Sequence, residues 1–190
     1  MQQHVNEYCE KLARALKLGA MDRVPHLGKT LRECWKQGRK VFLCGNGGSA
    51  ANAMHIANDL LFGAGLKNQG GLKAEALSAN QAVLTCLAND IGYDAIYAKQ
   101  IKVKAEREDV LIVLSGSGNS PNVVKALEVG NAKGMITFAI LGYSGGRCKE
   151  IAQFPIHFEI HDMQIAEDLQ LSVGHMCMQW LCANPINGSP

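Results

Sequence analysis

Long apolar runs and clusters of like charge are both missing from this chain of 190 residues. It has 19 Lys and Arg against 17 Asp and Glu, a formal net charge of +2. Because proteins that bind nucleic-acid backbones carry basic patches, this balance argues against a nucleic-acid partner. No apolar stretch reaches the roughly 18 residues of a membrane span, and the N-terminus lacks a basic-then-apolar signal pattern. We therefore expect no nucleic-acid or membrane partner.

The chain also lacks any Cys-x-x-Cys pair, although it contains seven cysteines. Their number is odd and their positions are scattered, and several lie in apolar surroundings. Such a set is typical of reduced, buried thiols rather than of a disulfide framework. The sequence therefore predicts a cytoplasmic protein.

Apolar residues make up 47% of the chain, enough for a sizeable core in one domain. Apolar stripes at helical spacing predict two helices within residues 3–38. We expect three parts: a helical arm over 1–38, an α/β core over 39–183 and a tail over 184–190. The arm is equally suited to packing against a partner subunit or against its own domain.

Strands and helices alternate through the core. Short apolar runs predict strands, and the segments between them predict helices, with turns over 87–92 and 143–147 and a glycine-rich loop over 63–71. The strands are expected at 40–44, 72–77, 109–114, 136–141 and 155–160, and the helices at about 50–62, 80–86, 93–105, 121–133, 149–153 and 164–182. This alternation predicts a three-layer α/β sandwich with a five-stranded parallel sheet. Right-handed crossovers favour the flavodoxin-like strand order 2-1-3-4-5.

Two polar loops follow neighbouring strands of this sheet. Residues 45–49 read Gly-Asn-Gly-Gly-Ser, and residues 115–120 read Ser-Gly-Ser-Gly-Asn-Ser. In the expected strand order both lie at the topological switch point and face each other across one crevice, where such folds bind ligands. Glycines let the backbone approach a ligand, and the first amides of the following helices favour an anion. The sequence therefore predicts a site for a phosphate-bearing small molecule, although the second loop alone could be a flexible helix cap.

The kind of ligand follows from what the loops lack. Residues 45–50 fit the dinucleotide fingerprint G-x-G-x-x-A, but the second strand ends in Leu77-Ser78-Ala79, without the acid that binds a ribose. No Lys follows the glycines, so the nucleotide-binding P-loop pattern fails too. A nicotinamide-dependent enzyme is thus the weaker alternative. What remains is a set of hydroxyls and amides suited to a phosphomonoester: Asn46, Ser49, Ser115, Ser117, Asn119 and Ser120.

Four ionisable residues lie on two predicted helices. His55 and Asp59 are four residues apart after the glycine turn, and Glu167 and His175 are eight apart in the last helix, so each pair shares roughly one face. Two His and two carboxylates can hold zinc or another divalent ion. They can equally serve as a metal-free acid–base pair. Taken singly, such residues are more often packed or solvated than functional.

Three segments together resemble the sugar isomerase (SIS) domain family, in particular its phosphoheptose isomerases, which interconvert sedoheptulose 7-phosphate and a heptose 7-phosphate. They are residues 44–51 with His55 following, residues 86–92 with an Asn-Asp pair, and residues 114–120, which look like the family's phosphate loop. The likeness extends over nearly the whole chain and implies a homotetramer with active sites between subunits. It also implies substrate contacts from Asn46, Gly47, Gly48, Ser49, Asn89, Asp90, Ser115, Gly116, Ser117 and Ser120.

The resemblance further implies a metal site, often zinc, at His55, Asp59, Glu167 and His175. Two positions depart from the family pattern, since Asp59 stands where the family has Glu and Glu167 where it has Gln. We expect an aldose–ketose isomerase that works through an enediol, with Asp59 or Glu167 as the base, His175 as the acid and His55 supporting the metal. The alternative is a non-catalytic SIS module that senses a phosphosugar or binds a protein partner.

Overall fold

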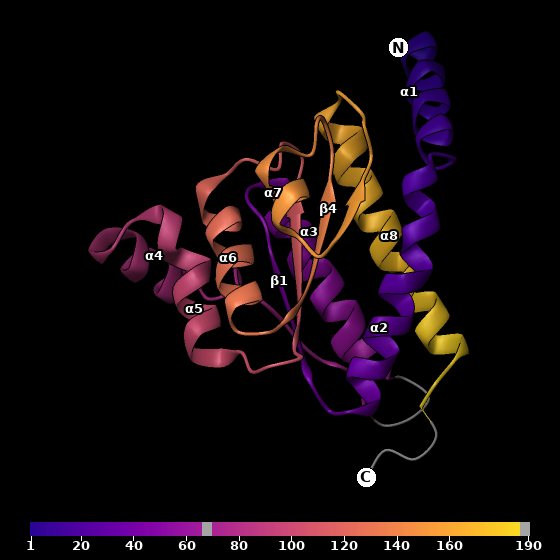
Figure 1. Ribbon diagram of the computed structural model, residues 1–190. Helices are drawn as coiled ribbons and strands as arrows, with labels where there is room; N and C mark the ends of the chain where they lie inside the picture. Colours follow the sequence, from indigo (N-terminus) through magenta and orange to yellow (C-terminus); the bar gives the residue numbers. More distant parts are fainter. Residues whose placement is uncertain (66–69, 187–190) are drawn as a thin grey trace.

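The computed structural model describes residues 1–65 and 70–186 (Figure 1). Part of the loop expected over 63–71, and the end of the tail expected over 184–190, lie outside the described residues. The helices are α1 (Gln2–Ala15), η1 (Gly19–Arg23), α2 (Val24–Lys36), α3 (Gly48–Asn58), η2 (Asp59–Gly63), α4 (Gln81–Asp90), η3 (Tyr93–Ala95), α5 (Ile96–Lys104), α6 (Pro121–Ala132), α7 (Gly146–Ile151) and α8 (Met163–Ala183). The strands are β1 (Lys40–Cys44), β2 (Lys73–Ala76), β3 (Val110–Ser115), β4 (Ile136–Leu141) and β5 (Phe154–His157).

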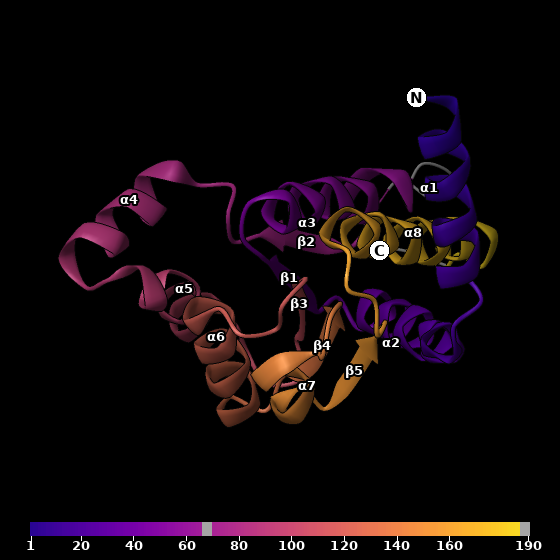
Figure 2. The same ribbon diagram turned by 90° about the horizontal axis from the view of Figure 1, so that it is seen from above.

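The sheet confirms the expected order β2-β1-β3-β4-β5, and all of its pairings are parallel. Side chains alternate across it, so Val41 and Leu43 enter one core while Phe42 and Cys44 enter the other. Helices α2, α3 and α8 cover the first face, and α5, α6 and α7 cover the second (Figure 2). Burial on both faces explains the continuous apolar run of β3, whose six residues are all buried.

The N-terminal helices divide into a packed part and an outlying part. Helix α2 buries Leu27, Leu31 and Trp35 in the same core as the sheet, so it packs against its own domain. Helix α1 buries only Ala15 and contacts α8. Two polar contacts fasten it there: the Tyr8 hydroxyl donates to Asp168 Oδ2 at 2.5 Å, and Lys11 pairs with Asp162 at 2.7 Å.

The helix expected over 80–86 is longer than predicted. Helix α4 continues to Asp90, so the expected turn over 87–92 was wrong for its first four residues. Gly92, at a φ of 127°, makes the turn instead. Helix α4 buries no residue fully and projects from the body of the molecule (Figures 1 and 2).

The other differences from the expected elements are small. The helix after the glycine turn changes at Asp59 from α-helix to a π-helical turn, which reaches Gly63. Helix α7 begins at Gly146, three residues before the predicted start, so the turn expected over 143–147 is shorter. Within the described residues, no helix combines the length and the apolar character needed to cross a membrane.

Candidate active site

The loop after β3 presents serine hydroxyls at the carboxyl end of the sheet. Ser115 Oγ accepts the Gly118 amide at 3.0 Å, and Ser117 Oγ accepts the Asn119 amide at 3.3 Å. Each hydroxyl therefore keeps its own proton to donate to a ligand. Ser120 precedes α6 and makes no side-chain cap, so its hydroxyl is available as well.

Side chains from α5, α6 and η3 hold the glycine turn (residues 45–49) by hydrogen bonds. The buried Tyr97 hydroxyl donates to the Gly45 carbonyl, and Gly47 takes a φ of 54° that favours glycine. Asn46 and Asn122 exchange two side-chain hydrogen bonds, of 2.9 and 2.7 Å, which tie this turn to the start of α6. The Tyr93 hydroxyl donates to Asn46 Oδ1 at 3.1 Å.

Sequence reasoning missed Tyr93, Tyr97 and Asn122. Asn122 directly follows the Ser-rich loop and its Pro, which is the one signal that could have drawn attention to it. The two tyrosines follow the Asn-Asp pair, but nothing in their spacing indicates that their hydroxyls reach the glycine turn.

The two loops enclose one cavity of about 280 Å³, as their expected convergence requires. Nine of the predicted substrate-binding or catalytic residues line it, together with Met163: Asn46, Gly47, Gly48, Ser49, Ser115, Gly116, Ser117, Ser120 and Glu167. Met163 was not predicted. Glu167 is the one charged residue in this lining, which contains no Lys, Arg or His.

Glu167 reaches the cavity from the first turns of α8 and lies against Gly48. A Cβ added at Gly48 would lie 2.5 Å from the carboxyl carbon of Glu167, so this approach requires glycine. The position is the N-terminus of α3, where the helix dipole favours a negative charge. Among the described residues, nothing donates a hydrogen bond to the Glu167 carboxylate.

Helices α3 and α8 run side by side in the same direction (Figure 2). Their contacts keep nearly the same offset in sequence, since Gly48 meets Glu167 at one end and Ile56 meets Gly174 further along. Asn52, buried between them, donates to the Glu167 carbonyl at 3.0 Å and to Gln170 Oε1 at 3.1 Å. These bonds fix the register of α8 on α3 and therefore the place of Glu167.

His55, Asp59 and His175 come together about two turns along this helix pair. The two His Nε2 atoms are 3.0 Å apart, and Asp59 Oδ2 lies 3.5 Å from His55 Nε2 and 3.7 Å from His175 Nε2. Asp59 is mostly buried, while both imidazoles are half exposed.

The spacing of these three residues suits a divalent ion. Ligands at 2.0–2.1 Å from a tetrahedral zinc lie about 3.4 Å apart, close to the three separations here, and solvent exposure leaves a position open. His55, Asp59 and His175 could therefore hold a metal ion. Glu167 stands apart from this group, since eight residues of α-helix separate it from His175 by about 12 Å along the axis.

Asn89 and Asp90 lie elsewhere, on the exposed end of α4. They bond to each other, with Asn89 Nδ2 donating to Asp90 Oδ1 at 2.8 Å, and Asp90 also accepts from the Cys86 thiol at 3.4 Å. Neither residue lines the cavity. Their contact with a ligand stays a prediction.

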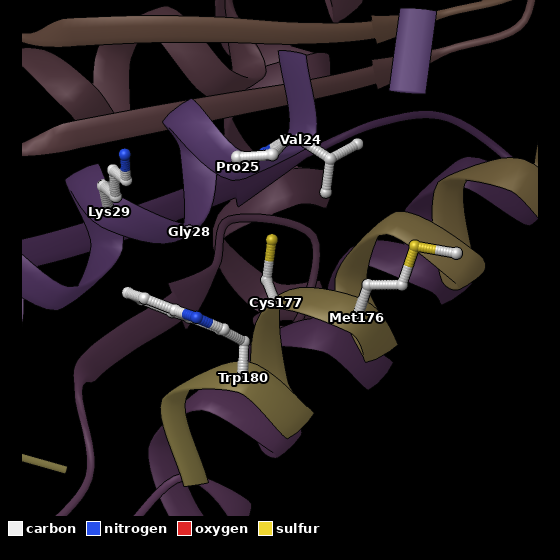
Figure 3. A pocket seen from close by; sticks show the side chains of 7 residues that line it. All are labelled: Val24, Pro25, Gly28, Lys29, Met176, Cys177 and Trp180. Carbon is white, nitrogen blue, oxygen red and sulfur yellow. The ribbon is translucent and has the colours of Figure 1, made fainter. Parts of the chain in front are cut away.

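A second cavity, of about 260 Å³, opens between α2 and α8 (Figure 3). The Trp180 indole packs 3.5 Å from where a Gly28 Cβ would be, and Val24, Pro25, Met176 and Cys177 complete an apolar lining. Lys29 is its only charged residue. This lining offers no set of donors for a phosphate, so it differs in kind from the cavity between the loops.

Comparisons with known proteins agree with this geometry. The family model described as SIS domain matches residues 4–142. A phosphoheptose isomerase of Rhodospirillum rubrum is 34% identical over 180 residues, 93% of this chain and 94% of that protein. One from Nitratiruptor sp. is 38% identical over 144 residues, 76% of each chain. The solved structure of a phosphoheptose isomerase from Neisseria gonorrhoeae, 24% identical, covers 96% of this chain and 98% of its own with a TM-score of 0.86, and it supports the fold alone.

Proposed function

Since the chain belongs to the SIS domain family, and within it to the phosphoheptose isomerases, we propose that it interconverts sedoheptulose 7-phosphate and an aldoheptose 7-phosphate. The observation that carries the proposal is the pairing of a serine-lined cavity with a His–Asp–His group on the same two helices. The loop from Ser115 to Ser120 binds the phosphate through hydroxyls and the amides at the start of α6.

The length of the substrate fits the spacing of these parts. Seven residues of α3, from Gly48 at the cavity to His55, span about 10 Å. With C–C bonds of ~1.5 Å, an extended seven-carbon chain places its first carbon roughly 10 Å from the phosphorus. A heptose 7-phosphate held at the serine loop is thus long enough to bring C1 and C2 near His55, Asp59 and His175.

Isomerisation moves one proton between neighbouring carbons. Asp59 takes the proton from the carbon beside the carbonyl, and His175 donates a proton to the carbonyl oxygen, which gives the enediol. Reversal of these steps at the other carbon completes the reaction. We assign the base to Asp59 because its carboxylate lies 3.7 Å from His175, whereas Glu167 lies two turns away.

In the alternative to this acid–base pair, His55, Asp59 and His175 would hold a divalent ion such as zinc, which would polarise the carbonyl and stabilise negative charge on the enediol oxygens in place of a proton from His175. Metal content of the purified protein, measured by mass spectrometry for wild type and His55→Ala, tests this set.

The activity is tested with sedoheptulose 7-phosphate in deuterated water, where isomerisation incorporates deuterium at C2 of the aldose or C1 of the ketose. We expect His175→Ala to lower kcat/KM by at least about 100-fold. Ser172→Ala, one turn earlier on α8, is the matched control because its hydroxyl bonds only within its own helix. Equal rates for wild type and His175→Ala would contradict the assignment, and absence of turnover in wild type would favour the non-catalytic module.

We also propose a cytoplasmic homotetramer. All seven cysteines are free thiols, which suits a reducing compartment. Exposed apolar residues lie on α3, η2 and α8, and contact between copies would bury them: Met54, Leu61, Phe62, Met176 and Trp180. Of these, Met176 and Trp180 line the cavity of Figure 3. Sedimentation of the purified chain tests the state, because a monomer at micromolar concentration would contradict it.

A further inference from the structure

The cavity between the two loops has an unusual charge for a phosphate site. A phosphomonoester is an acceptor with about two negative charges at neutral pH, yet the only charged side chain in the lining is the Glu167 carboxylate. The phosphate is therefore bound by neutral donors, and a second anion already stands in the same cavity.

The lining of the cavity offers two opposite kinds of hydrogen-bonding group. Ser115 and Ser117 already accept amide protons, so their hydroxyls are left to donate. Glu167 is acceptor-only when ionised, and no described residue donates to it. A partly buried carboxylate without partners is costly, so a ligand that supplies donors here gains free energy.

The contacts of α3 determine where the backbone of Glu167 lies and leave room for its carboxylate. Gly48 leaves the space that the carboxylate occupies, and Asn52 holds the main chain of Glu167 against α3 at 3.0 Å. The backbone of Glu167 therefore holds one place on α3, and its side chain extends from there into the cavity.

We propose that Glu167 is a specificity-determining residue, which selects phosphosugars that present hydroxyl or ammonium donors beyond the phosphate and rejects those that carry a second anionic group there. This inference rests on the proposed function only in that the cavity binds a phosphosugar. It concerns recognition and is independent of which residue moves the proton.

Three six-carbon probes of matched length test the proposal by titration calorimetry on the full chain. Glucose 6-phosphate carries hydroxyls, glucosamine 6-phosphate adds an ammonium group, and 6-phosphogluconate adds a carboxylate. A unit charge a few ångströms from a partly exposed carboxylate changes affinity by roughly tenfold. We expect glucosamine 6-phosphate to bind wild type tighter than glucose 6-phosphate, and 6-phosphogluconate to bind about tenfold more weakly than glucose 6-phosphate.

Glu167→Gln keeps the shape and removes the charge, so both affinity ratios should fall toward one. Asp168→Asn is the matched control: it makes the same charge change at the next residue of α8, where the carboxylate accepts from Tyr8 instead of lining the cavity. Its ratios should equal those of wild type.

The possible outcomes show whether the inference, the phosphosugar site or the proposed isomerase activity is wrong. Equal ratios in wild type and Glu167→Gln overturn the inference and leave phosphosugar binding intact. Binding of no probe by wild type overturns the inference together with the phosphosugar site. The expected ratios without turnover of sedoheptulose 7-phosphate support the inference and overturn the isomerase.

Discussion

Replacing Gly48 with Ala moves the Glu167 carboxylate without disturbing the core. The new Cβ would lie 2.4 Å from both Glu167 carboxylate oxygens, and ordinary contacts begin at 3.4 Å, so the carboxylate must retreat by about 1.0 Å. Glu167 can do so because only the end of a flexible side chain is in the way. The backbone at Gly48 is not in the positive-φ region, so Ala is tolerated there.

The effects on stability and on activity should therefore separate. Ala in place of Gly favours a helix by about 0.5–1 kcal/mol. Loss of a carboxylate at the helix N-terminus costs about 0.3–1 kcal/mol. The two nearly cancel, so we expect a Tm within about 3 °C of wild type for a chain of this size. A misplacement of about 1 Å at a substrate-positioning group can lower the rate 100-fold, and we expect kcat/KM to fall by between 10- and 100-fold.

The assay pairs thermal unfolding with steady-state turnover of sedoheptulose 7-phosphate. Gly63→Ala is the control, because a Cβ there would meet Met178 at an ordinary 3.5 Å. It should leave kcat/KM within about twofold of wild type. If Gly48→Ala retained full kcat/KM at unchanged Tm, the position of the Glu167 carboxylate would be irrelevant to the reaction and our reasoning would be refuted.

Three further predictions test the supports of the site. Asn52→Leu leaves the Glu167 carbonyl and Gln170 without their shared donor, so the free energy of unfolding should drop by about 1–3 kcal/mol in urea titrations. The affinity of the protein for a divalent metal should fall as well. Unchanged metal affinity would show that these two bonds do not set the register of α8 on α3. Asp162→Ala removes the N-cap of α8 and should cost about 1 kcal/mol at pH 7. A hydrogen bond from Lys11 lowers the pKa of Asp162 below its ordinary 3.8 in the folded state. The difference between wild type and Asp162→Ala should therefore be fully present above pH 4 and should be lost as the pH falls through the lowered pKa; a constant difference down to pH 2 would contradict it. Cys9 and Cys86 are both exposed, but a hydrogen bond to Asp90 raises the pKa of Cys86. Cys9 should therefore be alkylated faster than Cys86 at pH 8, as measured by peptide mass spectrometry. Equal rates of alkylation would contradict this prediction.

The sheet could be predicted because its sequence signals are local and redundant. Each strand is a short apolar run, and the handedness of the crossovers leaves few arrangements for five such strands. The same strand order places the loops at 45–49 and 115–120 on one cavity, because both follow neighbouring strands at the carboxyl edge of the sheet. The pairing of His55 with His175 could be suspected only from residue type, since no local pattern fixes how α3 and α8 align.

The rest depended on contacts that the sequence does not encode locally. The continuation of α4 to Asp90 was missed because Asn89 and Asp90 are poor helix formers and read as a turn. The separation of Glu167 from His175 follows from helical rise, but spacing alone had grouped them on one face. The Asn46–Asn122 pair joins residues 76 apart, which no periodicity reveals.

The partnership of α3 with α8 also has a consequence for how the protein comes to be made. His55 and His175 are separated by 120 residues, and α8 is the last helix of the described chain. The five strands can leave the ribosome and pair before α8 exists, but one face of the sheet then lacks Leu169, Val173 and Leu181, which are all buried there. Until α8 has emerged, the nascent chain has no reacting centre and this apolar face is only partly covered, so docking of one helix completes the core and switches on the chemistry in the same step.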